Sequence, residues 1–537
     1  MKIKSATFVL LSGLLAFNAY SADQLSIIPL PQQLLVKEGT FSIDSSTRVC
    51  LSGENRELRS SAEYFASLIR QSSGIELPID QLASCKDQVN AVLLVLEDRG
   101  LGAEAYELVV GENGIHITAK TPQGVFYGLQ SVRQLLPPQV ESSEQVEGLE
   151  LAVPLVQIKD RPRYTWRGLM LDESRHFFGK AYVKKLLEQM AALKMNVFHW
   201  HLTDAPGWRL EVKKYPKLTT IGGVGNKSDP SAPAAFYTQD DIREIIAYAA
   251  QRHIQVLPEI DMPGHATAAN RAYPEHSGGG NEKRPDFTFN PGREETYSYL
   301  ADILEETAAL FPAPWIHYGG DEVHFANSQW IDIPEVKALM AENDLQDLKE
   351  VEHYFNRRMA DEIDHLGKKT VAWDEVVDAG TDPDKTIIIW WRHNMPEQLS
   401  KALDKGFDVV LSPRRPLYFD FVQHDSHEKG RRWDGFNDLQ QVYEYPDFPA
   451  NYTEKQHEQI LGMQASMWSE TVQTRERLDY MIFPRLTALA EAAWTDASNK
   501  DYKNYRQRLE SMLERYDVLK INYFNPFTPE ETLEPQR

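Results

Sequence analysis

Two acidic residues, Asp321 and Glu322, stand side by side in the stretch W-I-H-Y-G-G-D-E-V-H (315–324), after a short apolar run and two glycines. Neighbouring like charges repel and burial raises a carboxyl pKa, so we expect one of the pair to hold a proton near neutral pH. A protonated carboxyl beside an ionised one is suited to cleaving a glycosidic bond. The plain alternative is an exposed acidic turn at the start of a helix. The glycines, and the aromatic and histidine residues elsewhere in the chain, favour the chemical interpretation.

The region after residue 160 alternates strand-like and helical patterns, and these elements would position the acidic pair. Eight strand-like runs are found at 168–171, 196–201, 254–257, 315–318, 370–373, 386–390, 408–411 and 462–467. Helical stretches separate most of them, for example 181–193, 240–252, 294–310 and 348–365. This order predicts an α/β fold of the (β/α)8 TIM-barrel type. An open doubly wound sheet is the alternative, but no glycine-rich nucleotide loop follows the first strand.

Charged and aromatic residues recur at the C-terminal ends of these strands, where barrel enzymes carry their active residues. The candidates are Arg175, His201, Asp204, Asp261, His265, Asp321, Glu322, Trp373, Trp391, Tyr418, Asp420, Trp468 and Glu470. Each has a structural alternative: a buried histidine, a core tryptophan, or a surface arginine or acid. Tryptophans at three strand ends favour a wall that stacks on the apolar face of a sugar ring.

Residues 23–160 show a mixed pattern that predicts a smaller N-terminal α+β domain. Helical spacing is found at 60–71 and 128–136, and a strand-like run at 91–96. Two further strand-like runs, 106–110 and 115–118, flank a Gly-Glu-Asn-Gly turn that predicts a β-hairpin. The catalytic barrel is expected at 161–500. A C-terminal segment, 501–537, is expected to pack a helix on the barrel.

The chain of 537 residues has a formal net charge of -22. This charge disfavours nucleic acid and anionic membranes as partners, and it also disfavours polyanionic substrates. A neutral substrate is the better fit. The sequence leaves the oligomeric state open.

The N-terminus has the pattern of a secretory signal peptide, expected at 1–21: a charged start, an apolar run at 8–17 and a small-x-small site at 19–21. Export to the periplasm or the medium is therefore expected. The two cysteines, Cys50 and Cys85, both follow this segment. They could pair in an oxidising compartment or remain as thiols, because sequence alone does not give their separation.

Six ordered motifs make the chain resemble the family 20 glycoside hydrolases, the β-N-acetylhexosaminidases, from about residue 25 to the C-terminus. The motifs are W-R-G-L-M-L-D (166–172) with S-R-H-F (174–177), residues 196–202 with Asp204, P-E-I-D-M-P-G-H (258–265), H-Y-G-G-D-E-V (317–323), A-W-D-E (372–375) and W-S-E (468–470). The resemblance implies an exo-acting retaining glycosidase that removes terminal N-acetylhexosamine residues and needs no cofactor or metal. Its partners would be neutral N-acetylated oligosaccharides or glycan ends.

The resemblance also implies roles for individual residues. Glu322 would be the general acid, and Asp321 would orient the substrate's 2-acetamido group, whose carbonyl oxygen attacks the anomeric carbon to give an oxazolinium ion. Tyr418 would donate a hydrogen bond to that oxygen. This substrate assistance relies on the proximity of a tethered nucleophile.

The remaining implied roles concern binding. Arg175 and Glu470 would bind hydroxyls at C3, C4 and C6, with Asp420 near C4 and C6. The acetamido pocket and the ring face would be lined by Trp373, Trp391 and Trp468. Two histidine–aspartate pairs would tune the acid, namely His265 with Asp261 and His201 with Asp204. The segment 423–451, with Trp433, Tyr443 and Tyr445, could shape the side of the leaving group.

A metal-dependent barrel hydrolase is the rival interpretation. Its ligands would be His199, His201, Asp204 and His265. This interpretation places a histidine pair on the second strand but does not explain the tryptophans.

Overall fold

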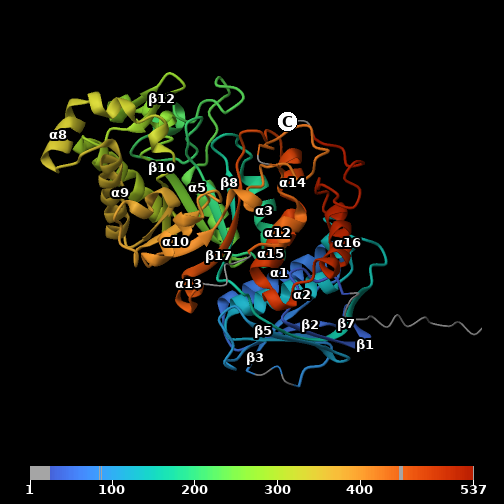
Figure 1. Ribbon diagram of the computed structural model, residues 1–537. Helices are drawn as coiled ribbons and strands as arrows, with labels where there is room; N and C mark the ends of the chain where they lie inside the picture. Colours follow the sequence, from blue (N-terminus) through green and yellow to red (C-terminus); the bar gives the residue numbers. More distant parts are fainter. Residues whose placement is uncertain (1–24, 84, 86, 434, 447–451, 536–537) are drawn as a thin grey trace, which may run out of the picture.

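The computed structural model describes residues 25–83, 85, 87–433, 435–446 and 452–535, so the expected signal peptide (1–21) lies outside the described residues. The N-terminal part is a seven-stranded mixed sheet with two helices, α1 (Arg56–Ser73) and α2 (Pro122–Leu135). Figure 1 shows these helices between the sheet and the second, larger part of the molecule. The sheet order is β1 (Gln33–Ile43), β7 (Leu151–Asp160), β5 (Tyr106–Gly111), β6 (Gly114–Ala119), β4 (Ala91–Leu96), β2 (Arg48–Ser52) and β3 (Ile79–Leu82).

Two local features of this domain answer questions raised by the sequence. The predicted hairpin is confirmed, because β5 and β6 pair antiparallel and close at Gly111 and Gly114. Cys50 on β2 and Cys85 beyond β3 form a disulfide, with their Cα atoms 6.0 Å apart. The pairing that the sequence left open is therefore made.

The larger part is a closed barrel of eight parallel strands wrapped by helices, which confirms the predicted fold class (Figure 1). The strands are β8 (Trp166–Asp172), β9 (Val197–His201), β10 (Gln255–Met262), β13 (Trp315–Gly319), β14 (Lys369–Trp373), β15 (Thr386–Trp390), β16 (Asp408–Leu411) and β17 (Ile460–Met467). Their positions match the eight predicted runs. The largest difference is at β10, which runs five residues beyond its predicted end, so that Asp261 belongs to the strand itself.

The barrel interior is filled by side chains from alternate strand positions, as the two-residue period of a strand requires. Lower layers include Trp166 and Met170 of β8 and Ile387 of β15. The same buried cluster continues upward to Trp373 and Trp468 at the C-terminal ends of the strands. The apolar core therefore ends in an aromatic surface at the mouth of the barrel.

A buried carboxylate joins the two parts of the molecule. Asp160, the last residue of β7, lies 3.0 Å from the Nζ atom of Lys194, and both side chains are fully buried. The hydroxyl of Tyr106 and the indole N–H of Trp494 also donate hydrogen bonds to Asp160, at 2.6 and 2.9 Å. These partners come from the N-terminal sheet, from the loop before β9 and from the end of a helix that follows β17, so one charge holds three segments together.

The C-terminal helix α16 (Tyr502–Val518) contacts both the barrel and the N-terminal domain. Arg508 pairs with Glu491 of the barrel helix α15 (Arg485–Trp494) at 2.6 Å. Arg515 donates to the carbonyl of Gln134, at the end of α2, at 2.7 Å. Within the described chain, no helix combines the length and apolar character needed to cross a bilayer.

Replacing Asp160 with alanine should destabilise the whole molecule, because Lys194 would keep a buried charge with no acid beside it. We expect a loss of about 3–5 kcal/mol in the free energy of unfolding, measured by chemical denaturation. The matched control is Asp80→Ala, which removes the exposed partner of Arg48 and should cost at most about 1 kcal/mol. Equal effects of the two substitutions would contradict the assigned role of Asp160.

Candidate active site

The acidic pair follows β13 on a turn whose backbone requires unusual conformations. Gly319, Gly320 and Glu322 have φ angles of 80°, 89° and 52°, all in the left-handed region. A Cβ atom on Gly319 would lie 2.1 Å from Oδ1 of Asp261, so no larger residue fits there without a shift. This turn ends the strict alternation of the strand. The two adjacent acids are therefore free to face the same side.

Both carboxylates of the pair face one imidazole. Nε2 of His265 lies 3.6 Å from Oδ2 of Asp321 and 3.6 Å from Oε2 of Glu322. The Asp321 side chain is 15% exposed and that of Glu322 is 29% exposed. The two acids therefore share one site, but Glu322 is more exposed to solvent than Asp321.

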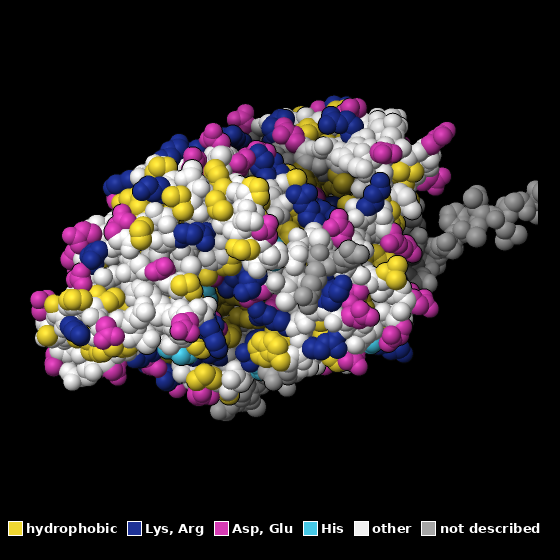
Figure 2. Space-filling model, turned by 90° about the horizontal axis from the view of Figure 1, so that it is seen from above, with side chains coloured by type: hydrophobic (Ala, Val, Ile, Leu, Met, Phe, Trp, Pro, Cys, Tyr) yellow, Lys and Arg dark blue, Asp and Glu magenta, His cyan; other side chains and the backbone are white. Residues whose placement is uncertain are grey.

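The pair lines a cavity of about 360 Å³ at the mouth of the barrel. Seen from above, the molecule is hollowed near its centre, and basic side chains gather around the hollow (Figure 2). The lining residues are Arg175, His265, Arg284, Asp321, Glu322, Trp373, Trp391, Arg414, Tyr418, Arg431, Trp433, Trp468 and Glu470. The other candidates, Asp420, His201, Asp204 and Asp261, are buried and contact this lining from behind.

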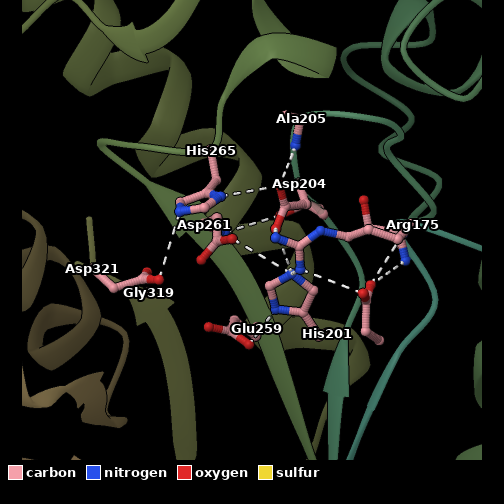
Figure 3. Close-up of polar contacts among 12 residues, drawn as sticks. Arg175, His201, Asp204, Ala205, Glu259, Asp261, His265, Gly319 and Asp321 are labelled. Atoms are coloured by element: carbon pink, nitrogen blue, oxygen red, sulfur yellow. Dashed lines mark hydrogen bonds and ion pairs between the residues drawn. The ribbon is translucent and has the colours of Figure 1, made fainter. Parts of the chain in front are cut away.

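A buried chain of acids and imidazoles supports His265 from behind (Figure 3). Nδ1 of His265 lies 3.0 Å from Oδ1 of Asp204, and Oδ2 of Asp204 lies 3.0 Å from Nε2 of His201. Nδ1 of His201 is 2.5 Å from Oε2 of Glu259. The expected partnership of His265 with Asp261 is replaced by one with Asp204. Asp204 follows β9 and reaches both histidines, whereas Asp261 lies 3.6 Å from His201.

The charges of this chain follow from its geometry. Burial disfavours the charged form of His265, but Asp204 and Asp321 outweigh it and raise the imidazole pKa to about 10. For Asp321, burial raises the pKa to about 7; His265 opposes this rise, whereas Glu375 and Glu322 add to it. Burial thus brings the pKa of one carboxyl of the pair close to neutral pH, as the sequence predicted.

Glu259 is the buried centre of this region, and sequence reasoning gave it no role. Besides His201, Nε2 of His199 lies 3.0 Å and Nδ1 of His317 lies 2.9 Å from its carboxylate. The indole N–H of Trp373 donates to Oε1 of Glu259 at 2.8 Å. Burial would raise the pKa of Glu259, but the three histidines hold it well below its usual range. One anion thus orients both a wall tryptophan and the histidine chain.

The predicted tryptophans form a continuous aromatic wall with Tyr418. Ring centres are 5.9 Å apart for Trp373 and Trp468, and 6.1 Å apart for Trp468 and Tyr418. Trp391 and Tyr418 are nearly parallel, with centres 6.2 Å apart. The wall can hold the apolar face of a ring or a methyl group beside the acidic pair.

Arg175 and Glu470 lie together at another side of the cavity. Arg175 is fixed by Asp204, with Nη2 and Oδ2 2.6 Å apart. Arg431 pairs with Glu470 at 2.5 Å and with Asp420 at 3.1 Å. Buried donors and acceptors of this kind can bind vicinal hydroxyl groups.

Comparison with known families identifies the arrangement. Residues 164–497 match the model of the "Glycosyl hydrolase family 20, catalytic domain", and residues 24–161 match that of "Glycosyl hydrolase family 20, domain 2". The chain belongs to glycosyl hydrolase family 20. The resemblance found from the motifs is thereby confirmed.

Individual relatives agree with this membership. The "Beta-hexosaminidase" of Porphyromonas gingivalis is 36% identical over 94% of this chain, which spans 65% of that relative's length. That of Vibrio furnissii is 36% identical over 88% of this chain and 77% of the relative. Among solved structures, the GH20 exo-β-N-acetylglucosaminidase of Vibrio harveyi in complex with N-acetylglucosamine has a TM-score of 0.84 at 32% identity, covering 95% of this chain and 79% of that one. The Streptomyces coelicolor enzyme has a TM-score of 0.81 at 30% identity, covering 94% and 98%.

Three arginines of the family 20 cavity were not among the predicted site residues: Arg284, Arg414 and Arg431. They lie in a hairpin and in the long segment after β16, away from the strand ends that guided the prediction. Of the aromatic residues noted at 423–451, Trp433 lines the cavity. Tyr443 instead packs on α16, with its ring 4.6 Å from that of Tyr505, and Tyr445 is not part of the lining.

The rival metal set does not come together. Within the described residues, the groups of acidic and histidine side chains close enough to share an ion contain at most two of His199, His201, Asp204 and His265. One such group combines Asp204 and His265 with Asp261. The predicted ligands are divided among neighbouring clusters, where each already contacts a carboxylate or an imidazole.

His265 should remain charged well above neutral pH, and Asp204 should be the main reason. Histidine NMR signals should show His265 still protonated at about pH 8, whereas Asp204→Asn should bring its titration towards the ordinary value of about 6.5. His253 provides an internal reference, because burial lowers its pKa to about 4 and it should stay neutral in both proteins. A His265 that titrates near its ordinary value before substitution would contradict this assignment.

Proposed function

We propose that the protein is an exo-acting, retaining β-N-acetylhexosaminidase that removes terminal N-acetylglucosamine or N-acetylgalactosamine by substrate-assisted catalysis. One observation carries the proposal: Asp321 and Glu322 approach the same His265 nitrogen within one cavity, beside an aromatic wall. Two neighbouring carboxyls in different environments can divide the roles of acid and electrostatic partner. Membership of family 20 supports the same activity.

Glu322 is the residue we assign to proton transfer. Its side chain is the more exposed of the two, so it lies towards the side from which a leaving group departs. It would protonate the glycosidic oxygen as the bond to the anomeric carbon breaks. It would then take a proton from the water that opens the intermediate, which is the usual exchange of roles in a retaining mechanism.

Asp321 is the residue we assign to the acetamido group. The acetamido oxygen would attack the anomeric carbon, and positive charge would develop on the resulting oxazolinium ring. An ionised Asp321 would accept the acetamido N–H and stabilise this charge, while the Tyr418 hydroxyl would donate to the attacking oxygen. The nearby His265 cation favours the ionised form of Asp321.

The terminal sugar would be held by the remaining side chains. Arg175, Glu470 and Asp420 would bind its hydroxyl groups, while the tryptophan wall would hold the ring face and the acetamido methyl group. Because these groups would enclose the sugar on the side away from the leaving group, we expect exo-cleavage from the non-reducing end.

The setting of the reaction is also proposed here. The signal-peptide pattern supports export to the periplasm or the medium. The net charge of -22 supports neutral N-acetylated oligosaccharides or glycan ends as substrates, and it argues against nucleic acid or membranes as partners.

Substrate assistance predicts a strict requirement for the acetamido group. A panel of aryl β-glycosides with either an acetamido or a hydroxyl group at C2 should be cleaved at rates differing by at least about a thousandfold, because the hydroxyl analogue lacks the tethered nucleophile. Release of the aryl group measures both rates, with chitobiose as a natural-type control. Efficient hydrolysis of the plain glucoside would refute the mechanism.

The acid role predicts that Glu322→Gln will discriminate between leaving groups. For a poor leaving group such as a sugar, kcat/KM should fall by about 10²–10⁴-fold. An activated aryl glycoside needs less protonation, so its loss should be much smaller. Glu282→Gln, which neutralises an exposed acid outside the cavity lining, is the matched control. An equal loss on both substrates would count against proton donation by Glu322.

A further inference from the structure

The cavity lining is rich in arginine although the chain as a whole is strongly acidic. The chain carries a formal charge of -22. The cavity lining, however, holds four arginines and His265 against three carboxylates, and it contains no lysine. Figure 2 shows basic side chains around the hollow. Arg175, Arg431 and His265 already face carboxylates. The charge offered to a bound molecule therefore depends on whether a lining arginine lacks such a partner.

Arg284 differs from the two arginines already described. Arg175 and Arg431 are tied to carboxylates behind the cavity. Arg284 is exposed on β12 (Arg284–Phe289), and within the described residues no carboxylate forms an ion pair with it. Its guanidinium carbon instead lies 4.5 Å from the ring centre of Phe325 and 5.6 Å from that of Phe287. Aromatic faces hold the guanidinium group in place without neutralising it.

The contacts of Arg284 place it beside the proposed acid. Phe325 lies on the same turn as Glu322, and its backbone N–H donates to the carbonyl of Glu322 at 3.0 Å. The side chain of Asn281, on strand β11 (Ser277–Asn281), donates to the carbonyl of Phe325 at 2.8 Å. The hairpin that carries Arg284 is thus fastened to the turn that carries Glu322.

An acid that protonates the leaving oxygen faces the unit that departs. The surface next to Glu322 is therefore the surface that this unit would meet. Phe325 and Trp433 are large apolar side chains left 39% and 49% exposed. The guanidinium carbon of Arg414 lies 4.4 Å from the ring centre of Trp433. This side of the cavity combines exposed aromatic rings with guanidinium groups.

From this combination we propose that the leaving-group side of the cavity is a subsite for an anionic unit, such as a uronic acid or another carboxylate- or sulfate-bearing sugar, with Arg284 binding its charge. A guanidinium group binds a carboxylate or sulfate through two parallel hydrogen bonds, and the exposed rings supply faces for a sugar to stack on. The proposal rests on the proposed glycosidase function and specifies its substrate class.

The negative charge of the whole chain does not oppose this binding strongly. At physiological ionic strength, charges more than about 8 Å apart in solvent are largely screened. A bound anion would therefore respond mainly to the charges closest to it, among them the guanidinium group of Arg284. The expectation of a neutral substrate, drawn from the net charge, then concerns the terminal sugar. Binding of the leaving unit depends on the charges close to it.

The test compares two disaccharides that differ in one group. Both carry β-1,4-linked N-acetylglucosamine, on glucuronic acid in one and on glucose in the other, and released N-acetylglucosamine is measured. The unmodified protein should show a higher kcat/KM for the acidic disaccharide. Arg284→Gln should reduce this preference about fivefold, which corresponds to about 1 kcal/mol, mainly through KM. Raising the salt concentration should reduce it as well.

Lys283→Gln is the matched control, because it removes the same charge from the adjacent exposed residue outside the cavity lining. It should leave the preference unchanged. The proposal is overturned if the unmodified protein cleaves both disaccharides equally well, or if Arg284→Gln slows both to the same extent. If neither disaccharide nor an aryl N-acetylglucosaminide is cleaved, the proposed function itself fails, and this proposal fails with it.

Discussion

The buried alternation of acid and base from Glu259 through His201 and Asp204 to His265 is the interaction on which the site depends. A single charge transferred into a protein interior costs several kcal/mol unless an opposite charge and hydrogen bonds offset it. In this chain each charge has an opposite neighbour within 3.0 Å. The alternation ends in a cation at His265, and that cation allows two carboxylates to approach each other at the mouth of the barrel.

The same arrangement gives the two carboxylates different properties. Asp321 is deeper, and burial raises its pKa to about 7, while Glu322 extends towards solvent. A substrate group that carries partial positive charge would favour the ionised Asp321, so binding and ionisation would be coupled. The left-handed backbone at Gly319, Gly320 and Glu322 makes this division possible. On a regular strand, adjacent side chains would point to opposite faces.

The sequence predicted the elements whose pattern is local and periodic. The barrel strands and the Asp321–Glu322 turn were found because apolar runs and glycines mark them directly. The pairing of His265 with Asp204 was not found, because it depends on how the end of β9 lies against the residues that follow β10. Arg284 and Arg431 were missed because neither lies at the end of a barrel strand: Arg284 begins β12 of a hairpin that follows β10, and Arg431 lies in the long segment after β16. Net charge averages over the whole surface, so it carries no information about an individual group such as the Arg284 guanidinium.

The residues expected to carry out the reaction and those expected to select the leaving unit lie on different parts of the fold. Trp373 ends the barrel strand β14, and Asp321 lies two residues beyond the end of β13, so the barrel framework sets the position of both. Arg284 and Trp433 lie on a hairpin and a long connection, where substitutions and insertions cost little stability. The reaction of the terminal sugar is therefore fixed by the framework, while recognition of the leaving unit can change with these two segments. A carboxylate-binding arginine fastened beside the acid, as Arg284 is through Phe325, can alter the choice of leaving unit without altering the chemistry.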